Sequence, residues 1–450
     1  MSRRLVTWVS ARCLRWFYRN HRILGGERVP TNGPVLLVGN HPNDLPDVIG
    51  GLFTTPRPVR YIATVSVTSS SAARWTYEAM GVIPVARVRD ARTMKARGVD
   101  MVAVNAAAAA AVVQALTDGD VVGVFPEGGV HDVPAIGRLR TGVATMVLQY
   151  LDAGAYNDVI LVPFGAQYEA PRTPGSDVVV QVGVPESLRA WRQAQPPEQA
   201  GAAALTARLL EALRAVTRNS ASWAEAESRD ELVAARAAQV APRDPLAAAP
   251  ALVPAAQAIA ADAHSDGPSP SAIRLRTAAH LLARAVERAG GIGTSAVDHA
   301  RLLSALDVQS QPAPVPALVL WMGLPAAVIG GVVHGPVLWV VWRFARRQAK
   351  ARADVVARAF VPGLYLVGLW YGLVTLLAAG GLLAWGGSPL WALLLPVVLP
   401  RFGDLALGWR AWYRAARLVT RVHRWSTPER QALRDAAAVL REAWSAPRLD

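Results

Sequence analysis

Short apolar runs alternate with helical stretches through residues 34–185. The runs are rich in β-branched residues and have the length of buried strands. We expect strands at residues 35–39, 60–64, 121–125, 159–164 and 177–183. An alanine-rich stretch at residues 101–118 predicts a helix that ends before Gly119. This alternation is typical of an α/β domain with a largely buried sheet.

The pattern changes after this segment. Residues 186–306 are helical and polar, and the Pro- and Ala-rich residues 241–271 among them predict a linker. Residues 308–342 and 359–400 contain no aspartate, glutamate, lysine or arginine. A helix crosses the hydrocarbon core in about 20 residues, so residues 359–400 have room for two spans. For residues 308–342 we expect one tilted helix or a re-entrant hairpin. The alternative for both apolar stretches is a buried soluble helical hairpin.

Basic residues predict the orientation of these segments. Residues 343–358 and 401–424 each carry six basic side chains and one acidic side chain. We therefore expect both on the cytoplasmic side, with residues 359–400 forming a helical hairpin. If the α/β domain is also cytoplasmic, residues 308–342 must enter and leave on one side, which favours the re-entrant form. Residues 3–22 interleave arginines with apolar residues, which predicts an interfacial helix or a docked surface helix.

Composition narrows the class of partner. The 450 residues include 47 basic and 33 acidic side chains, a formal net charge of +14, and 52% of them are hydrophobic. A basic, apolar chain suits membrane phospholipid and phosphorylated substrates. No motif of a nucleic-acid-binding fold is present, so we expect no nucleic-acid partner. Cys13 is the only cysteine, which excludes an intrachain disulfide and argues against structural zinc.

A histidine follows the first predicted strand, in the stretch LLVGNHPNDLPDVIGG. Side chains at the carboxyl end of such a strand reach the crevice where α/β folds bind ligands. His41 has two carboxylate neighbours, Asp44 and Asp47, and an imidazole held by a carboxylate is the usual general base. Prolines on both sides of Asp44 predict a helix that starts near Asp44 or Leu45, so that Asp47 turns back to His41. A structural histidine in a turn is the alternative.

Three more blocks follow in order. GVIPVAR ends in Arg87, whose guanidinium suits a phosphate held by two hydrogen bonds. FPEGGVHD supplies Glu127, Gly128 and Gly129, and the glycines let the backbone approach a ligand. VPFG ends a further predicted strand. Glu127 could instead brace the turn, and the following His-Asp pair could indicate a metal phosphohydrolase, although the other histidines lack metal spacing.

Together these blocks resemble the glycerol-3-phosphate and lysophosphatidate acyltransferase superfamily over residues 28–185. They look like a branch with the motifs His-Pro-Asn-x-x-x-Asp and Phe-Pro-Glu-Gly-Gly-x-His-Asp. The more usual family pattern has four residues between the histidine and the aspartate, and an arginine in the third block. Here five residues separate His41 from Asp47, and that arginine is missing. The candidates to complete a phosphate site are Arg89, Arg138 and Arg140.

The resemblance implies an O-acyltransferase of phospholipid synthesis, with a mixed sheet flanked by helices and with C-terminal membrane helices. His41, oriented by Asp47, would activate an acceptor hydroxyl toward an acyl thioester, with no metal or cofactor. Acyl-CoA or acyl-carrier protein would be the donor, and glycerol 3-phosphate or a lysophospholipid the acceptor. The implied substrate-binding residues are Arg87, Glu127, Gly128 and Gly129. Another hydroxyl-bearing lipid acceptor, or a non-catalytic lipid-binding protein of the same fold, is the alternative.

These patterns divide the chain into four parts. We expect residues 1–27 to form a basic membrane-surface helix and residues 28–200 the acyltransferase domain. Residues 201–307 are expected to be helical with the Pro/Ala-rich linker. Residues 308–450 should hold the membrane helices and a basic C-terminal tail. The catalytic domain is expected at the membrane, on its cytoplasmic face.

Overall fold

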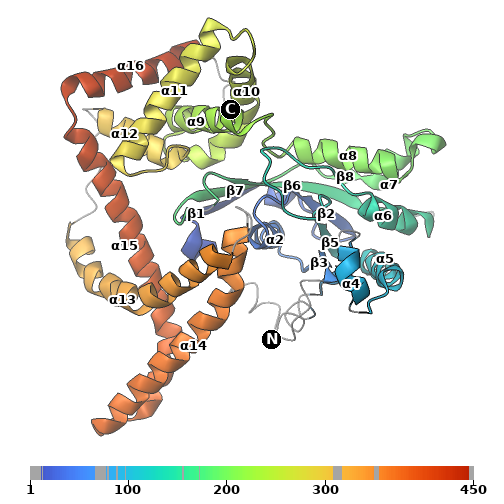
Figure 1. The fold of residues 1–450 in the computed structure, drawn as a ribbon, viewed down its shortest axis with the longest axis horizontal. Helices are drawn as coiled ribbons and strands as arrows, with labels where there is room; N and C mark the ends of the chain where they lie inside the picture. Colours follow the sequence, from blue (N-terminus) through green and yellow to red (C-terminus); the bar gives the residue numbers. More distant parts are fainter. Residues whose placement is uncertain are drawn as a thin grey trace. The chain divides into compact units, whose positions relative to one another are not determined.

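The chain folds into two units in the computed structural model (Figure 1). Unit 1 is built mainly from His21–Tyr168 and Val178–Ala221, and unit 2 from Trp16–Asn20, Glu169–Asp177 and the chain from Ser222 onward. The structure describes residues 12, 14–65, 78, 81–87, 90–96, 98–154, 157–171, 173–307, 317–348 and 354–444. Most of the predicted N-terminal helix, with Cys13, lies outside these residues, and its expected end at residues 20–24 is a strand.

A mixed sheet forms the centre of unit 1. Within the described residues it has eight strands in the order β1-β7-β6-β2-β5-β3-β4, with β8 paired to β6. The strands are β1 (Asn20–Leu24), β2 (Val35–Gly39), β3 (Val59–Thr64), β4 (Ile83–Val85), β5 (Val121–Val124), β6 (Ile160–Tyr168), β7 (Asp177–Val182) and β8 (Glu186–Ser187). The path from β6 through β2, β5 and β3 to β4 is parallel, whereas β7 and β8 are antiparallel to β6. All five predicted strands are therefore confirmed.

Both faces of the sheet are covered. The helices of unit 1 are α2 (Leu45–Leu52), α4 (Ala91–Ala96), α5 (Met101–Thr117), α6 (Gly142–Asp152), α7 (Leu188–Gln193) and α8 (Ala202–Arg214), with the 3-10 turns η1 (Gly26–Arg28) and η4 (Pro197–Gln199). Leu36 and Val38 of β2 pack with α5, α6 and α8, while Val35 and Leu37 face the opposite cluster. Burial on both faces explains the continuous apolar run of this strand. Because α8 contributes to the first cluster, unit 1 extends past the boundary expected at residue 200.

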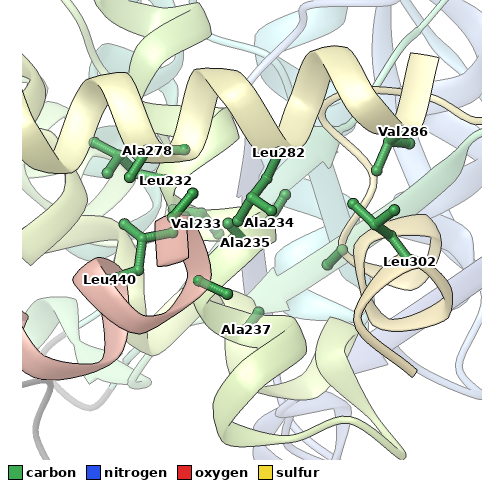
Figure 2. Packing of buried hydrophobic residues seen from close by; sticks show 14 of the residues in the cluster. Leu232, Val233, Ala234, Ala235, Ala237, Ala278, Leu282, Val286, Leu302 and Leu440 are labelled. Carbon is green, nitrogen blue, oxygen red and sulfur yellow. The ribbon is translucent and has the colours of Figure 1, made fainter. Parts of the chain in front are cut away.

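A helical bundle forms the core of unit 2. It contains α9 (Trp223–Val240), α10 (Pro245–Ala263), α11 (Pro270–Ala289), α12 (Ala296–Leu306) and α16 (Thr427–Ala443). Figure 2 shows Leu232, Leu282, Leu302 and Leu440, all completely buried, in one hydrophobic cluster between these helices. The basic C-terminal tail expected from the sequence is thus partly a core helix, α16.

The linker predicted at residues 241–271 is wrong, because most of it is helix α10. The side chain of Asp244 caps the first turn, and Pro245 occupies a position in that turn where its missing N–H costs nothing. Ala256 and Ala260 are completely buried, so the small side chains bring the neighbouring helices close. The Ala-rich composition therefore reflects helix packing rather than chain flexibility.

Four helical segments among the described residues are long and apolar enough to cross a membrane: α10, most of α13 (Ala317–Gln348), most of α14 (Asp354–Ala384), and the 3-10 turn η5 (Pro389–Leu394) with α15 (Leu395–His423). They differ in burial. None of the apolar stretch Tyr365–Ala384 of α14 is buried inside the protein, whereas α10 is 39% buried in the bundle. An apolar helix without protein around it requires lipid, so α14 and its neighbours indicate a membrane protein. In the described part of the 308–342 segment, α13 is one continuous helix rather than a hairpin.

The packing of α12 and α16 limits the membrane topology. Both helices contribute to one hydrophobic core, and they flank the three apolar C-terminal segments in the sequence. They must therefore lie on the same side of the membrane. The chain between Leu306 and Thr427 consequently makes an even number of complete crossings, so α13, α14 and α15 cannot all be complete spans.

Polar side chains link these apolar helices within unit 2. His334 on α13 is 3% exposed; its Nδ1 donates to the carbonyl oxygen of Gly330 (2.8 Å), and its Nε2 accepts from the hydroxyl of Tyr371 on α14 (2.6 Å). The Trp16 ring packs edge-on against His334, and Trp16 Nε1 donates to Asp404 Oδ1 on α15 at 2.9 Å. Interhelical hydrogen bonds of this kind stabilise helix association where lipid supplies no hydrophobic driving force.

We expect the full-length protein to remain in the membrane after alkaline carbonate extraction, measured by immunoblot of pellet and supernatant. Leu376→Arg on α14 should lower the inserted fraction, because arginine at the centre of a span costs about 2.5–3.5 kcal/mol. Val102→Arg on α5 is the matched control, since Leu376 and Val102 are 72% and 79% exposed. Release of the wild-type protein by carbonate would contradict the membrane assignment.

Candidate active site

Three of the predicted functional blocks follow the carboxyl ends of parallel strands. His41 comes after β2, Glu127 after β5 and Arg87 after β4. β2 and β5 are hydrogen-bonded neighbours with Val38 opposite Val124, so their following loops begin side by side. The Phe125 ring consequently stacks on the His41 imidazole, with 4.3 Å between ring centroids and 14° between planes. The sheet topology thus places the candidate groups along one edge.

Asp47 is the carboxylate that holds His41. Its Oδ2 lies 3.0 Å from His41 Nδ1, and the carboxylate is completely buried. Helix α2 begins at Leu45, as predicted, and puts Asp47 in its first turn. Asp44 precedes the helix at φ 59°, a conformation that L residues rarely adopt. Its half-exposed side chain lies 4.0 Å from Nε2, on the other side of the ring.

The hydrogen bonds of Asp47 define the state of the imidazole. Burial raises the pKa of Asp47, while hydrogen bonds from His41, Tyr168 and the Asn43 amide act in the opposite direction. A carboxylate at Nδ1 favours the tautomer with hydrogen on that atom. Nε2 is then the nitrogen that can accept a proton, as a general base requires.

Tyr168 belongs to this arrangement and was not predicted. Its hydroxyl donates to Asp47 Oδ1 at 2.6 Å, and it is the last residue of β6. Because β6 runs parallel to β2, its carboxyl end lies at the same edge. The Asn40 side chain reinforces this contact by exchanging two hydrogen bonds with the backbone of Ala166. The sequence does contain a signal for Tyr168: the strand continues beyond the VPFG block and ends in this tyrosine.

Glu127 braces the loops around His41. Its Oε1 accepts the His41 backbone N–H (2.8 Å), and its Oε2 accepts the Gly137 N–H (2.7 Å) and contacts the His131 ring. Burial opposes ionisation, but these hydrogen bonds outweigh it and lower the pKa of Glu127. The hydrogen bond to Glu127 in turn raises the pKa of His131. Both carboxylate oxygens are thus used within the protein, which favours the bracing role over direct substrate contact.

Two arginines meet at Gly128. Arg87 Nη1 donates to the Gly128 carbonyl oxygen at 3.1 Å, and its Nε donates to Asp90 at 2.7 Å. Gly128 has φ +71°, and a Cβ at this position would lie 3.3 Å from the Cγ of Arg140. The close approach and the positive φ both favour glycine here. Gly129 follows in the same loop, whereas Arg89 lies outside the described residues.

A family model matches the part of the chain that carries the candidate site. Residues 21–167 match the family model named Acyltransferase. They form an acyltransferase-family domain. All six site residues predicted from the sequence lie in this acyltransferase domain, and Tyr168 follows it directly.

The similar proteins overlap with only part of the chain. Over 74 residues it is 38% identical to Glycerol-3-phosphate O-acyltransferase 1 of Saccharomyces cerevisiae, covering 16% of this chain and 10% of the yeast protein. Over 73 residues it is 37% identical to an uncharacterized acyltransferase of Schizosaccharomyces pombe, covering 16% and 11%. A solved structure, the 1-acyl-sn-glycerophosphate (LPA) acyltransferase PlsC from Thermotoga maritima, matches 47% of this chain and 79% of that chain, with a TM-score of 0.32 and 17% identity. The chain thus matches about a tenth of either yeast protein.

The Glu127 brace predicts a pH-dependent stability. Ionised Glu127 stabilises the fold above its ordinary pKa, and this contribution is lost as the pH falls through the lowered pKa of the folded state. Protonated His131 contributes fully to stability below its ordinary pKa. This contribution is lost as the pH rises through the raised pKa of the folded state. We therefore expect Glu127→Gln to destabilise the protein by about 1–3 kcal/mol at mildly acidic pH, and the difference to shrink on further acidification.

Thermal unfolding of the purified protein across a pH series measures this difference. Glu186→Gln is the control, because the Glu186 carboxylate pairs with Arg208 at 2.9 Å but is 28% exposed. Such a pair is worth about 0–1 kcal/mol. Equal losses for the two variants would show that Glu127 does not act as a buried brace.

Proposed function

We propose that this protein is an O-acyltransferase that moves a fatty acyl group from an acyl thioester to a hydroxyl of glycerol 3-phosphate or a lysophospholipid. The observation that carries the proposal is the buried Asp47–His41 pair at the carboxyl edge of the sheet. The acyltransferase-family match supports the reaction class. The named activity of the Saccharomyces cerevisiae relative supports the choice of acceptor, over the short region that the two proteins share.

The geometry supports a direct transfer. His41 Nε2 takes the proton of the acceptor hydroxyl, and the oxygen attacks the thioester carbonyl carbon to form a C–O bond. The carbon–sulfur bond then breaks, and the imidazolium returns its proton to the leaving thiolate. Asp47 stabilises the transient imidazolium. Tyr168 and Glu127 fix Asp47 and the His41 backbone, so the ring is oriented before substrate binds.

Arg87 is the proposed ligand of the acceptor phosphate. Its Nη1 and Nε are held by Gly128 and Asp90, which fixes the plane of the guanidinium, while the side chain is 26% exposed. A fixed, partly exposed guanidinium suits phosphate oxygens better than a mobile one, because less side-chain entropy is lost on binding. Acyl-CoA or acyl-carrier protein is the proposed donor, and phospholipid synthesis the proposed setting. We propose no cofactor.

We place the catalytic domain on the cytoplasmic side, where water-soluble acyl donors are made. Of the three C-terminal apolar segments, α14 is the least buried in protein. If α14 and the apolar start of α15 are the two spans, the number of crossings is even. Both flanking segments, which are rich in basic residues, then lie on the cytoplasmic side. The last turns of α13 carry arginines over tryptophan rings, such as Arg346 at 5.2 Å from the Trp342 centroid, which suits the membrane interface. We therefore propose that α13 does not cross completely.

The catalytic assignment predicts a graded set of rates. His41→Ala should lower kcat by about 10²–10⁴-fold, the range for a lost general base. Asp47→Asn should also lower kcat, because the amide neither fixes the tautomer in the same way nor stabilises the imidazolium. Asp44→Asn is the matched control and should stay within a few fold. Steady-state transfer of labelled acyl-CoA to glycerol 3-phosphate and to lysophosphatidate measures these rates, with thermal melting to confirm folding.

The same series can refute the pairing. An inactive Asp44→Asn protein with an active Asp47→Asn protein would assign the catalytic carboxylate to Asp44. If the wild-type protein acylates only unphosphorylated hydroxyl acceptors, the proposed substrate class is wrong. If it transfers no acyl group, the protein is a non-catalytic lipid-binding protein.

The topology predicts which positions an impermeant maleimide reaches in a Cys13→Ser background. Cysteines introduced at Val133, Asp307, Gln348 and Arg417 should react only from the cytoplasmic side. A cysteine at Ser388, between α14 and α15, should react only from the opposite side. Labelling of Asp307 and Gln348 from opposite sides would make α13 a complete span.

A further inference from the structure

The arginine missing from the FPEGG block has a spatial counterpart. Arg140 is 12 positions beyond Gly128 in the sequence, yet its side chain lies against that glycine, where a Cβ would be 3.3 Å from Cγ and 3.9 Å from Nε of Arg140. The Arg140 backbone N–H donates to the carbonyl oxygen of Pro126 at 2.7 Å, which fixes the start of this side chain beside the loop. The loop is therefore packed by an arginine that reaches it from another segment.

The guanidinium of Arg140 is available to a ligand. Within the part of the chain that the structure describes, it makes no hydrogen bond or ion pair, and the residue is exposed. Arg87, which contacts the same glycine, is neutralised in part by Asp90. Arg140 has no such acidic partner among the described residues, so its positive charge beside Gly128 is not compensated by an ion pair.

The loop that contains Gly128 is also connected to His41. Glu127, the residue before Gly128, accepts the His41 backbone N–H at 2.8 Å. The residue before Gly128 thus holds the backbone of His41, and a ligand at Gly128 would lie next to that residue in the loop. A phosphate monoester offers three oxygens, enough for two guanidinium groups at once.

We propose that Arg140 and Arg87 together bind the phosphate monoester of the acceptor at Gly128. This inference rests on the proposed function and adds a second arginine to it. Arg140 makes the site selective for a phosphorylated acceptor over a neutral hydroxyl lipid. The phosphates of a CoA donor carry the same chemistry, so the experiment must separate the two sources.

Steady-state kinetics of the full-length protein test the proposal. Arg140→Gln should raise KM for glycerol 3-phosphate or lysophosphatidate by about 10–100-fold, the effect of losing hydrogen bonds between charged groups. The KM for acyl-CoA should not change. Arg140→Lys should recover only part of the loss, because an ammonium lacks the planar fork. Arg138 is the competing candidate from the sequence, and Arg138→Gln removes the same charge from a neighbouring exposed residue. The proposal expects Arg138→Gln to change KM by less than about twofold.

Protection of the protein by glycerol 3-phosphate against thermal unfolding provides a readout without turnover. We expect protection of the wild-type and Arg138→Gln proteins and little protection of Arg140→Gln at the same ligand concentration. Equal effects of Arg138→Gln and Arg140→Gln would overturn the proposal, as would a raised KM for acyl-CoA with an unchanged acceptor KM. Failure of the proposed function is seen separately, as absence of acyl transfer to phosphorylated acceptors by the wild-type protein.

Discussion

The completely buried carboxylate of Asp47 is the constraint on which the candidate site depends. A charge in this position is costly unless several donors replace water. Here the donors come from His41, from the Asn43 amide and from the hydroxyl of Tyr168. The first two lie in the loop after β2 and the third at the end of β6, so the carboxylate is satisfied only when these neighbouring strands are correctly paired. The active-site arrangement and the centre of the sheet are thus stabilised by the same contacts.

His41 is held at both ends by buried acids. Asp47 contacts the ring, while Glu127 accepts the backbone N–H, and each acid has further hydrogen bonds of its own. The stacked Phe125 ring then limits rotation of the imidazole. A base restrained in position, tautomer and plane loses little freedom when a substrate binds, which is the requirement for preorganised proton transfer. The cost is a loop that tolerates little change, since Glu127 and Gly128 each serve more than one contact.

Local pattern was sufficient for most of unit 1 and for the His41–Asp47 pair. The strands were predictable because parallel strands that are buried on both faces appear in the sequence as continuous apolar runs. The prolines on either side of Asp44 indicated the start of α2. Tyr168 was beyond reach for a different reason: it is 121 positions from Asp47, and only the pairing of β6 with β2 brings the two residues together. Arg140 was one of three candidate arginines, and the sequence alone does not show that its side chain lies against Gly128. Helix α10 was misread because alanine and proline occur both in linkers and in closely packed helices. The bracing role of Glu127 required knowledge of which amides face it.

The shared core of α12 and α16 also determines when unit 2 can be completed. During synthesis α9 to α12 emerge before the apolar helices, whereas α16 is made after them. Leu433 and Leu440 are nearly or completely buried in that core, so the bundle retains an open apolar face until the membrane segments have been inserted and the chain has returned. Folding of this unit is therefore tied to insertion, and a ribosome stalled between α15 and α16 would leave a bundle that is anchored but unclosed, a natural substrate for chaperones or proteases.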